Sequence, residues 1–349
     1  MSYSTIDKPT DYFNTKLYTG NGADDHAITG VNFQPDFVWI KTRSEANNHN
    51  LYDVIRGVNK PLKSNSTASE FTRTDAFKSF DSDGFTLDDD ATSDEVNKNT
   101  VTYASWNWLG ANGTASNSDG SITSTVSANT TAGFSIVSYT GTASAGATVG
   151  HGLGVKPDMI ITKARAIADN WGVYHKSLGA TKGLYLNTTN AEITSSAYYN
   201  NTEPTSTLVT LGDNEATNDN DTMIMYAFAE KKGYSKFGSY TGNGNADGTF
   251  VYLGFRPAWV MVKTTTDAGY NWVVYDNKRV GFNPDNDTLN ANETRAEQTT
   301  GFGHIDMVSN GFKIRASTND TNRSGNVFIY MAFAESPFVS SGGIPTTAR

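Results

Sequence analysis

The sequence contains no cysteine among its 349 residues. Neither a disulfide framework nor a thiolate metal site can therefore form, so the folded state must be stabilised by packing or by assembly. A long apolar run is also missing, and the segment from Met1 to Tyr18 is polar. We therefore expect neither a membrane span nor a secretory signal, and we predict that the chain folds in a cytoplasm.

Clusters of basic residues are missing as well. Acidic residues outnumber lysine and arginine by 36 to 27, which gives a formal net charge of −9. Binding to nucleic acid phosphates needs a concentrated basic surface, so the sequence argues against a DNA or RNA partner. An acidic, polar surface instead favours solubility and low non-specific adhesion.

The motifs of common catalysts are absent from the sequence. It has no P-loop, no Gly-x-Ser-x-Gly and no dinucleotide-binding glycine pattern, and its five histidines do not form His-x-x-x-His. His151 and His175 both lie in one part of the chain, without histidines at the corresponding places elsewhere. We therefore predict that the protein is not an enzyme.

A threefold repeat dominates what is present. Each copy begins with Tyr-Thr-Gly, passes through a proline and ends an apolar run on a lysine: Tyr18, Pro35 and Lys41; Tyr139, Pro157 and Lys163; Tyr240, Pro257 and Lys263. The proline follows the tyrosine by 17, 18 and 17 residues, and the lysine follows the proline by 6 in every copy. Turn residues that resemble each other by chance would not keep this register over a period of roughly 100 residues, so each copy should be a folded domain.

Further motifs follow in the same order in each copy. An asparagine-led aromatic stretch comes first, and an apolar run closes each copy: Asn50–Asp53 and Val101–Trp106; Asn170–His175 and Met223–Phe228; Asn271–Asp276 and Val327–Phe333. Copies one and three also share a Gly-Phe segment, at Asp83–Leu87 and Asn310–Ile314. The corresponding place in copy two is predicted at Thr207–Leu211.

The apolar runs between the proline and the lysine are typical of strands that are buried on both faces. The sequence therefore predicts an all-β protein of three tandem antiparallel β-sandwich, or jelly-roll-like, domains. The predicted divisions are repeat 1 at 1–108, a Ser/Thr/Gly-rich linker with a short strand in it at 109–133, repeat 2 at 134–232, repeat 3 at 233–335 and a C-terminal arm at 336–349. The short join between repeats 2 and 3 should fix them, while repeat 1 should swing more freely. The arm should be disordered or grip a neighbour.

Aromatic residues that recur beside asparagine suggest a binding surface. Exposed indole rings next to amide groups would form a platform on which a sugar could stack, which predicts glycan-binding residues at Asn170, Trp171, Asn271 and Trp272. If buried, the same residues belong to the core of the sandwich, and their recurrence at strand positions favours the core. The loops that differ between copies, Ala46–His49, Arg165–Asp169 and Thr265–Tyr270, are then better candidates for a specific surface.

Acidic segments suggest calcium. Asp81, Asp83, Asp219 and Asp221 are the candidate ligands, because calcium binds roughly six to eight oxygens and such loops can supply them. Their spacing matches no EF-hand, and a solvated turn built from Asx chemistry is the favoured interpretation. The sequence therefore predicts no cofactor, with calcium as the alternative.

Several segments resemble virion proteins of marine tailed bacteriophages: 18–41, 118–141, 150–158 and the terminal Gly-Ile-Pro-Thr-Thr-Ala-Arg at 343–349. The resemblance covers nearly the whole chain, but its motifs indicate no activity. It implies a non-enzymatic structural protein on the exterior of a phage particle, in a tail fibre or another appendage that contacts the host surface. The alternatives are a head decoration or head fibre, and a free lectin-like, carbohydrate-binding module.

The partners expected from this resemblance are other virion proteins, further copies of the chain, with a trimer favoured, and a glycan of the host surface. The expected location is the exterior of the virion, after folding in the host cytoplasm. The missing cysteines and the acidic composition fit this expectation. Repeated domains would also add avidity when several copies bind together.

Overall fold

The computed structural model describes residues 3–280, 282–300 and 303–346, and it confirms the predicted all-β class. The described residues form six sheets, in which the strands pair antiparallel. Helices in this part of the chain are single turns: η1 (Pro9–Asp11), α1 (Ser196–Tyr199), α2 (Glu215–Asn218) and α3 (Asn319–Asn322). None of them has the length and apolar character that crossing a bilayer requires. Residues 1–2 of predicted repeat 1 and 347–349 of the predicted arm lie outside the described residues.

Repeat 1 is built from two sheets. The inner sheet has the order β1 (Phe13–Thr19), β7 (Thr102–Trp108), β3 (Phe37–Thr42) and β4 (Asn50–Asp53). The outer sheet has the order β2 (His26–Thr29), β6 (Gly84–Leu87) and β5 (Phe77–Asp81).

Repeat 2 follows the same plan with a larger inner sheet. Its order is β15 (Ile193–Thr194), β14 (Lys182–Tyr185), β13 (Trp171–His175), β12 (Met159–Ala164), β17 (Thr222–Phe228), β10 (Phe134–Thr140), β9 (Ser124–Asn129) and β8 (Ala115–Asn117). The outer sheet is β11 (Thr148–Gly150) paired with β16 (Leu208–Thr210), so the predicted counterpart of the Gly-Phe segment at Thr207–Leu211 is confirmed. The segment 109–133, predicted as a linker with a short strand in it, contains two strands, β8 and β9, which extend this sheet.

Repeat 3 again has two sheets. The inner order is β18 (Ser235–Thr241), β25 (Val327–Pro337), β20 (Phe255–Thr264), β21 (Val273–Asp276) and β22 (Leu289–Asn290). The outer order is β19 (Phe250–Tyr252), β24 (Gly311–Ile314) and β23 (Ile305–Val308).

The proline-bounded strands are buried on both faces, as predicted, and the structure shows what covers each face. In β3 the side chains of Val38 and Ile40 belong to the core between the two sheets of repeat 1. Those of Phe37 and Trp39 point the other way, into a core that the three repeats share. Because side chains alternate along a strand, β12 and β20 divide their residues in the same manner.

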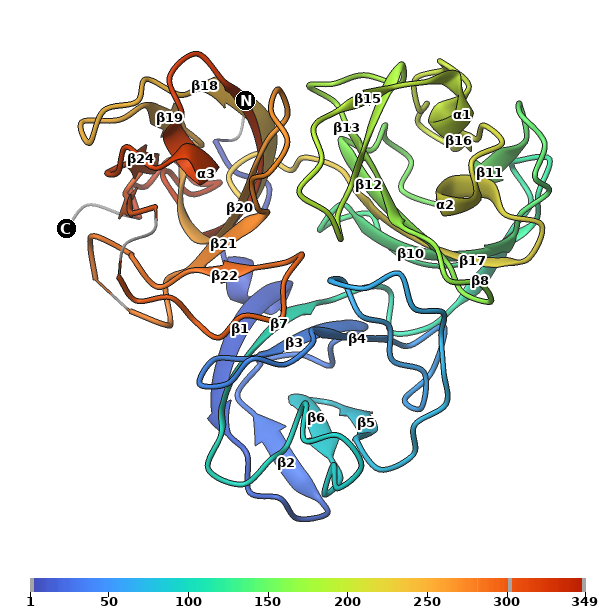
Figure 1. The fold of residues 1–349 in the computed structure, drawn as a ribbon, viewed down its shortest axis with the longest axis horizontal. Helices are drawn as coiled ribbons and strands as arrows, with labels where there is room; N and C mark the ends of the chain where they lie inside the picture. Colours follow the sequence, from blue (N-terminus) through green and yellow to red (C-terminus); the bar gives the residue numbers. More distant parts are fainter. Residues whose placement is uncertain (1–2, 281, 301–302, 347–349) are drawn as a thin grey trace.

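The shared core lies where the inner sheets of the three repeats meet, around the centre of the molecule in Figure 1. Aromatic rings from different repeats are in contact there. Phe37 stacks on Tyr226 at 4.4 Å, Phe13 on Phe333 at 5.0 Å, and the ring centroids of Trp108 and Trp259 are 5.8 Å apart. Repeat 1 therefore packs against the other two, which contradicts the expectation that it swings freely.

The Tyr-Thr-Gly triplets have the same structural role in each repeat. The tyrosine hydroxyl donates a hydrogen bond to the carbonyl that precedes a buried asparagine, at 2.8, 2.6 and 2.6 Å: Tyr18 to Val96, Tyr139 to Thr217 and Tyr240 to Thr321. The asparagine Oδ1 then accepts the N–H that follows the glycine: Asn97 from Asn21, Asn218 from Thr142 and Asn322 from Asn243. A Cβ on Gly141 would lie 2.0 Å from the Asp219 carbonyl, so this close approach of two backbones requires glycine.

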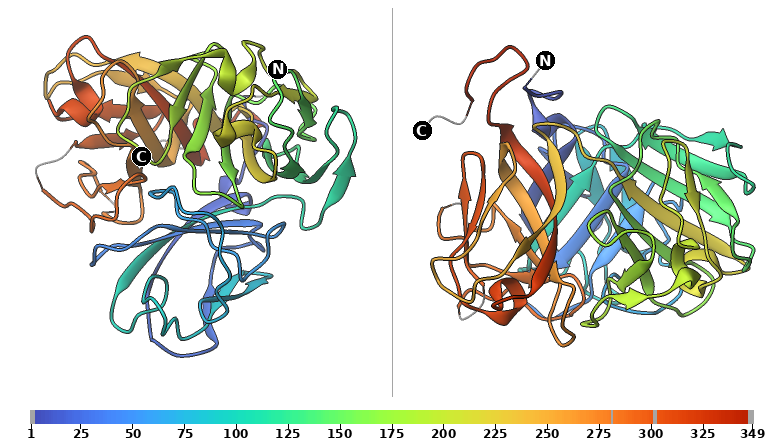
Figure 2. Two further views of the ribbon diagram at one scale, coloured as in Figure 1. Left: turned by 45° about the vertical axis from the view of Figure 1, so that its right-hand side comes forward. Right: turned by 90° about the horizontal axis from the view of Figure 1, so that it is seen from above.

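Both ends of the chain lie on the same side of the molecule, and the segment after β25 projects from that side (Figure 2). Val339 pairs with Pro345, and Ser340 donates its N–H to the Ile344 carbonyl at 2.8 Å. We call residues 338–346 the C-terminal hairpin. Ser341 donates its N–H to Asp7 at 2.6 Å, so the described part of the predicted arm contacts the N-terminal segment of its own chain.

Candidate functional site

The predicted glycan-binding tryptophans lie at the seams between repeats. Trp171 and Trp272 are 0% and 1% exposed, and His49 occupies the equivalent position in repeat 1. Each ring contacts a backbone carbonyl of a different repeat, with its nitrogen 2.9 Å from the oxygen: Trp171 with Lys63, Trp272 with Tyr185 and His49 with Asn290. In His49 the other nitrogen, Nδ1, accepts the Trp39 N–H, so Nε2 carries the proton and donates.

Asparagines later in each repeat hold these rings in place. They accept the backbone N–H of the ring residue: Asn65 from His49, Asn187 from Trp171 and Asn292 from Trp272. The same asparagine donates from Nδ2 to the Oδ1 of the asparagine that precedes the ring residue. The Nδ2–Oδ1 distances are 2.8, 2.8 and 2.7 Å: Asn65 to Asn48, Asn187 to Asn170 and Asn292 to Asn271. Asn170 and Asn271 are therefore engaged with their own repeats.

This placement overturns the glycan platform at Asn170, Trp171, Asn271 and Trp272. A sugar stacks on an exposed ring face, and both indole rings are covered by protein. The N–H groups of His49, Trp272 and Trp171 link the repeats in a cycle: repeat 1 contacts repeat 3, repeat 3 contacts repeat 2, and repeat 2 contacts repeat 1. The residues that recur are therefore the parts that join the repeats into a ring.

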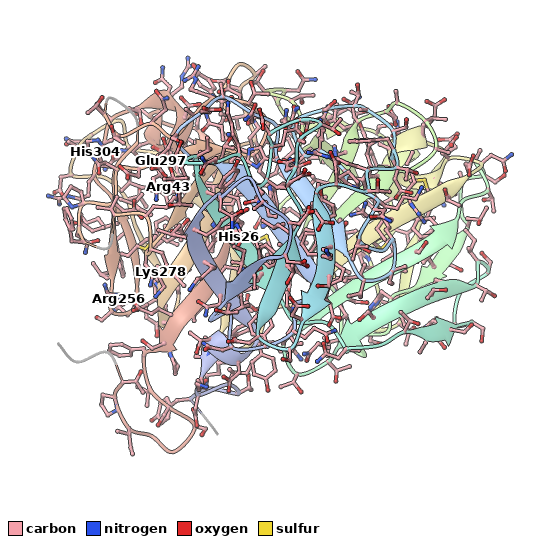
Figure 3. All side chains as sticks on the ribbon, turned by 90° about the horizontal axis from the view of Figure 1, so that it is seen from below. His26, Arg43, Arg256, Lys278, Glu297 and His304 are labelled. Atoms are coloured by element: carbon pink, nitrogen blue, oxygen red, sulfur yellow. The ribbon has the colours of Figure 1, made fainter. Side chains whose placement is uncertain are left out.

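A second set of contacts lies at the same three seams, with the donors in the opposite order around the ring. A glutamate donates its backbone N–H to a carbonyl of another repeat at 2.8 Å in all three seams: Glu70 to Arg165, Glu192 to Thr265 and Glu297 to Arg43. In two seams the glutamate also pairs with the arginine side chain, as Arg43 and Glu297 do in Figure 3. The third seam has Thr265 in place of an arginine, and there Glu192 pairs with Lys182 of its own repeat.

The lysines that end the proline-bounded strands are buried. Burial lowers the pKa of Lys41 to about 7 and the pKa of Lys163 and Lys263 to about 8, because a charged ammonium is disfavoured away from water. Each Nζ is surrounded by carbonyl oxygens, for example those of Thr42 for Lys41 and Tyr270 for Lys263, at 2.9 and 2.8 Å. The recurrence of a lysine was visible in the sequence, whereas its burial was not, since lysine is rarely buried without an acidic partner.

Three of the four candidate calcium ligands, Asp81, Asp83 and Asp221, accept local hydrogen bonds. Asp81 accepts the hydroxyls of Ser79 and Thr86 at 2.7 and 2.6 Å, and Asp83 accepts backbone N–H groups of the loop after β2. Asp221 accepts the N–H of Thr222, and the carbonyl of Asp219 packs against Gly141. Within the described residues, no three histidine, cysteine or acidic side chains gather to hold a metal ion.

His175, one of two buried histidines in repeat 2, predicts a pH dependence of stability. Burial lowers the pKa of His175 to about 4, and its ring contacts the Tyr330 carbonyl at 3.1 Å. The unfolded chain therefore binds a proton more readily than the folded one between about pH 6.5 and 4, so stability decreases as the pH falls through this window. We expect His175→Gln to flatten that decrease by roughly 1.4 kcal/mol per pH unit in urea unfolding measured from pH 7.5 to 4.5. Equal slopes for both proteins would contradict the prediction.

One exposed hollow was not predicted from the sequence. A cavity of about 190 Å³ lies beside the start of β18, between β19 and the C-terminal hairpin. Its lining includes Tyr3, Lys236, Tyr252 and Phe338, and the side chains of Tyr252 and Phe338 are 55% and 37% exposed. Lys236 lies over the Tyr252 ring at 5.2 Å. These residues occupy positions that differ between repeats, so a search for recurrent motifs does not find them.

Comparison with known proteins gives one family. The family model of a domain of unknown function, DUF7483, matches residues 8–337 and so covers all three repeats. The sequence matches no curated protein.

Proposed function

Because the chain belongs to the DUF7483 family, whose function is unknown, we propose a role from its own residues: a non-enzymatic structural protein on the exterior of a tailed-phage particle. Within the particle we propose a tail fibre or another appendage that contacts the host surface. The observation that carries this proposal is that the polar side chains at equivalent positions form contacts between repeats. The equivalent His and Trp rings, together with Arg and Glu residues, join the repeats instead of lining a reaction centre.

The phage assignment itself draws on the resemblance of segments such as 118–141 to virion proteins. The architecture supports a structural role, because a ring of sandwiches with one shared core is a rigid unit. One chain supplies three similar units around a centre, so the core closes without a second copy. The trimer expected from the sequence would therefore be an assembly of such rings.

Capsid decoration is the second candidate, and the position of the chain ends favours it. The N-terminal segment and the C-terminal hairpin lie together on one side, where they could attach to a shell (Figure 2). A free lectin-like module is the third candidate. The cavity beside Tyr252 is the feature that favours it, since its tyrosines are exposed as Trp171 and Trp272 are not.

The location on the particle can be tested directly. Phage particles purified from a lysate are expected to contain the protein by mass spectrometry, and immunogold labelling should place it on the tail for an appendage or on the head for decoration. Particles without the protein would overturn the virion proposal. A glycan array with the purified protein tests the third candidate, for which binding to a host polysaccharide is expected.

Removal of the C-terminal hairpin tests the attachment side. A chain that ends at Pro337 keeps the pairing of β25 with β20 intact, because Phe255 pairs with Pro337. We expect its melting temperature to stay within a few degrees of the full chain while its incorporation into particles is lost. Ser341→Ala, which removes only the hydroxyl contact with Asp7, is the matched control and should be incorporated normally. Normal incorporation of the shortened chain would exclude the hairpin as the attachment.

A further inference from the structure

The cavity beside Tyr252 is lined by side chains that replace smaller, uncharged ones in the other two repeats. The strand pairing aligns the equivalent positions, which hold Thr29 and Gly150 in place of Tyr252, and Asn14 and Ser135 in place of Lys236. None of these four residues is aromatic or charged. Because repeats 1 and 2 form the same strands without such side chains, the fold of repeat 3 does not require Tyr252 or Lys236.

Three exposed aromatic rings border this cavity, and two of them lie beneath a lysine. Tyr3, Tyr252 and Phe338 are 60%, 55% and 37% exposed. The Nζ of Lys232 lies 5.6 Å from the centre of the Tyr3 ring, and the Nζ of Lys236 lies 5.2 Å from the centre of the Tyr252 ring. Aromatic rings that stay exposed together around one hollow are characteristic of a binding surface.

The lining is positively charged, although the whole chain has a net charge of −9. Lys232 and Lys236 contribute two ammonium groups, and the carboxylate of Glu230 pairs with Lys176 at 2.7 Å. The ammonium of Lys236 has three N–H donors, of which one bonds to the Tyr252 carbonyl at 2.9 Å. Within the part of the chain that the structure describes, Lys236 forms no ion pair, so its charge is available to an anionic ligand.

We propose that the cavity beside Tyr252 binds an acidic sugar, a monosaccharide residue that carries a carboxylate or a sulfate. The sugar ring would pack its C–H groups against an exposed tyrosine ring, and its anionic group would accept an N–H of Lys236. Pockets for drug-sized ligands measure roughly 300–1,000 Å³, so a cavity of about 190 Å³ holds one ring and leaves the rest of a polysaccharide in solvent. The proposal rests on the proposed contact with the host surface, whose glycan it assigns to a chemical class.

An extended peptide fits this cavity less well than a sugar does. A peptide that adds to a sheet needs unpaired backbone groups, and those at the rim are already bonded within the chain. The N–H groups of Leu253 and Gly254 bond to the Asn310 carbonyl at 2.9 and 3.1 Å. The Gly254 carbonyl accepts the Phe338 N–H at 3.1 Å. A nucleic acid strand, which has a phosphate at every residue, needs a longer basic surface than two lysines.

A glycan array with the full chain tests the ligand class. The array carries oligosaccharides with uronic acid, sialic acid or sulfate, each beside a neutral counterpart made by methyl esterification or desulfation. We expect binding to an acidic member and about tenfold weaker binding to its neutral counterpart, because Lys236 then loses its charged partner. The member that binds distinguishes a carboxylate from a sulfate. If no acidic member binds above its neutral counterpart, the proposal is wrong.

Two variants locate the binding, and each has a matched control. Lys236→Gln removes the charge and Tyr252→Ala removes the ring, and both should bind the acidic sugar about tenfold more weakly at an unchanged melting temperature. Lys278→Gln and Phe250→Ala should bind like the wild type. Lys278 is exposed at a different hollow, of about 320 Å³, and Phe250 is exposed on β19 but does not line the cavity. Wild-type binding by both cavity variants would overturn the proposal.

The outcomes separate this inference from the proposed function. A protein that is present on the particle and binds no acidic sugar would overturn the inference alone. A protein that is absent from particles and binds an acidic sugar through Lys236 and Tyr252 would overturn the virion location alone. A capped oligoglutamate peptide that displaces the sugar and binds more tightly would also overturn the inference, because the cavity would then select an acidic peptide.

Discussion

Residues 109–234, expressed on their own, are expected not to fold into a cooperative monomer, although they contain both sheets of repeat 2. The inner face of that sheet supplies eleven large side chains to the shared core: Phe134, Ile136, Met159, Ile161, Trp171, Val173, Leu184, Leu186, Ile224, Tyr226 and Phe228. Burial of such a side chain stabilises a fold by roughly 1.5–3 kcal/mol, and a whole protein is typically stable by only roughly 5–15 kcal/mol. Exposing this face would therefore remove more free energy than an isolated repeat has.

The measurement is urea unfolding followed by tryptophan fluorescence, together with sedimentation. We expect the fragment to aggregate or to unfold without a sharp transition, and the full chain to unfold in one transition because its repeats share a core. Co-expression of residues 1–108 with residues 109–349 is the control. These two pieces should assemble into a soluble complex, because the contacts of the shared core, including those of Trp108 next to the cut, can still form between them. A monomeric, cooperatively unfolding fragment would show that repeat 2 is independent.

The strands were largely predictable because the repeat aligns them. Pro157–Lys163 is a short apolar run after a proline, and in all three copies such a run forms the central strand of an inner sheet. The sequence also indicated that these strands are buried on both faces. It could not indicate what covers the second face, because Phe37 and Val38 are equally apolar although they face different cores. The same apolar sequence pattern is therefore expected for three independent domains and for a ring with a shared core.

The segment 109–133 could be assigned only in part from its composition. Ser124–Asn129 consists of four small polar residues, one valine and one alanine, which suits a flexible linker as well as a strand. Ser124–Asn129 becomes a strand because it pairs with the edge of β10, and the position of this edge is determined only in the folded repeat. The partner of the Trp171 N–H was missed for a similar reason. It is the carbonyl of Lys63, which is close in space and far apart in sequence.

Replacing Asp276 by alanine is expected to lower the free energy of unfolding by about 3–5 kcal/mol, the usual cost of leaving one partner of a buried ion pair uncompensated. Asp276 and Arg279 have fully buried side chains, and Nε lies 2.7 Å from Oδ2. The same carboxylate accepts the Trp106 N–H from repeat 1 at 3.0 Å, so it joins two repeats as well. Repeat 1 contains the equivalent group, in which Asp53 pairs with Arg56 and accepts the Tyr226 hydroxyl of repeat 2 at 2.7 Å.

An exposed ion pair is the control that shows whether this loss of stability depends on burial. Glu45 and Lys98 are 3.0 Å apart with side chains 39% and 40% exposed, so Glu45→Ala should cost only about 0–1 kcal/mol. Both variants can be compared by urea unfolding at neutral pH. Trp106→Phe combined with Asp276→Ala should cost less than the sum of the two single changes, because the first removes a contact that the second has already lost. An Asp276→Ala protein as stable as the Glu45→Ala protein would mean that Glu297, 3.1 Å from Arg279, is enough to neutralise the buried guanidinium.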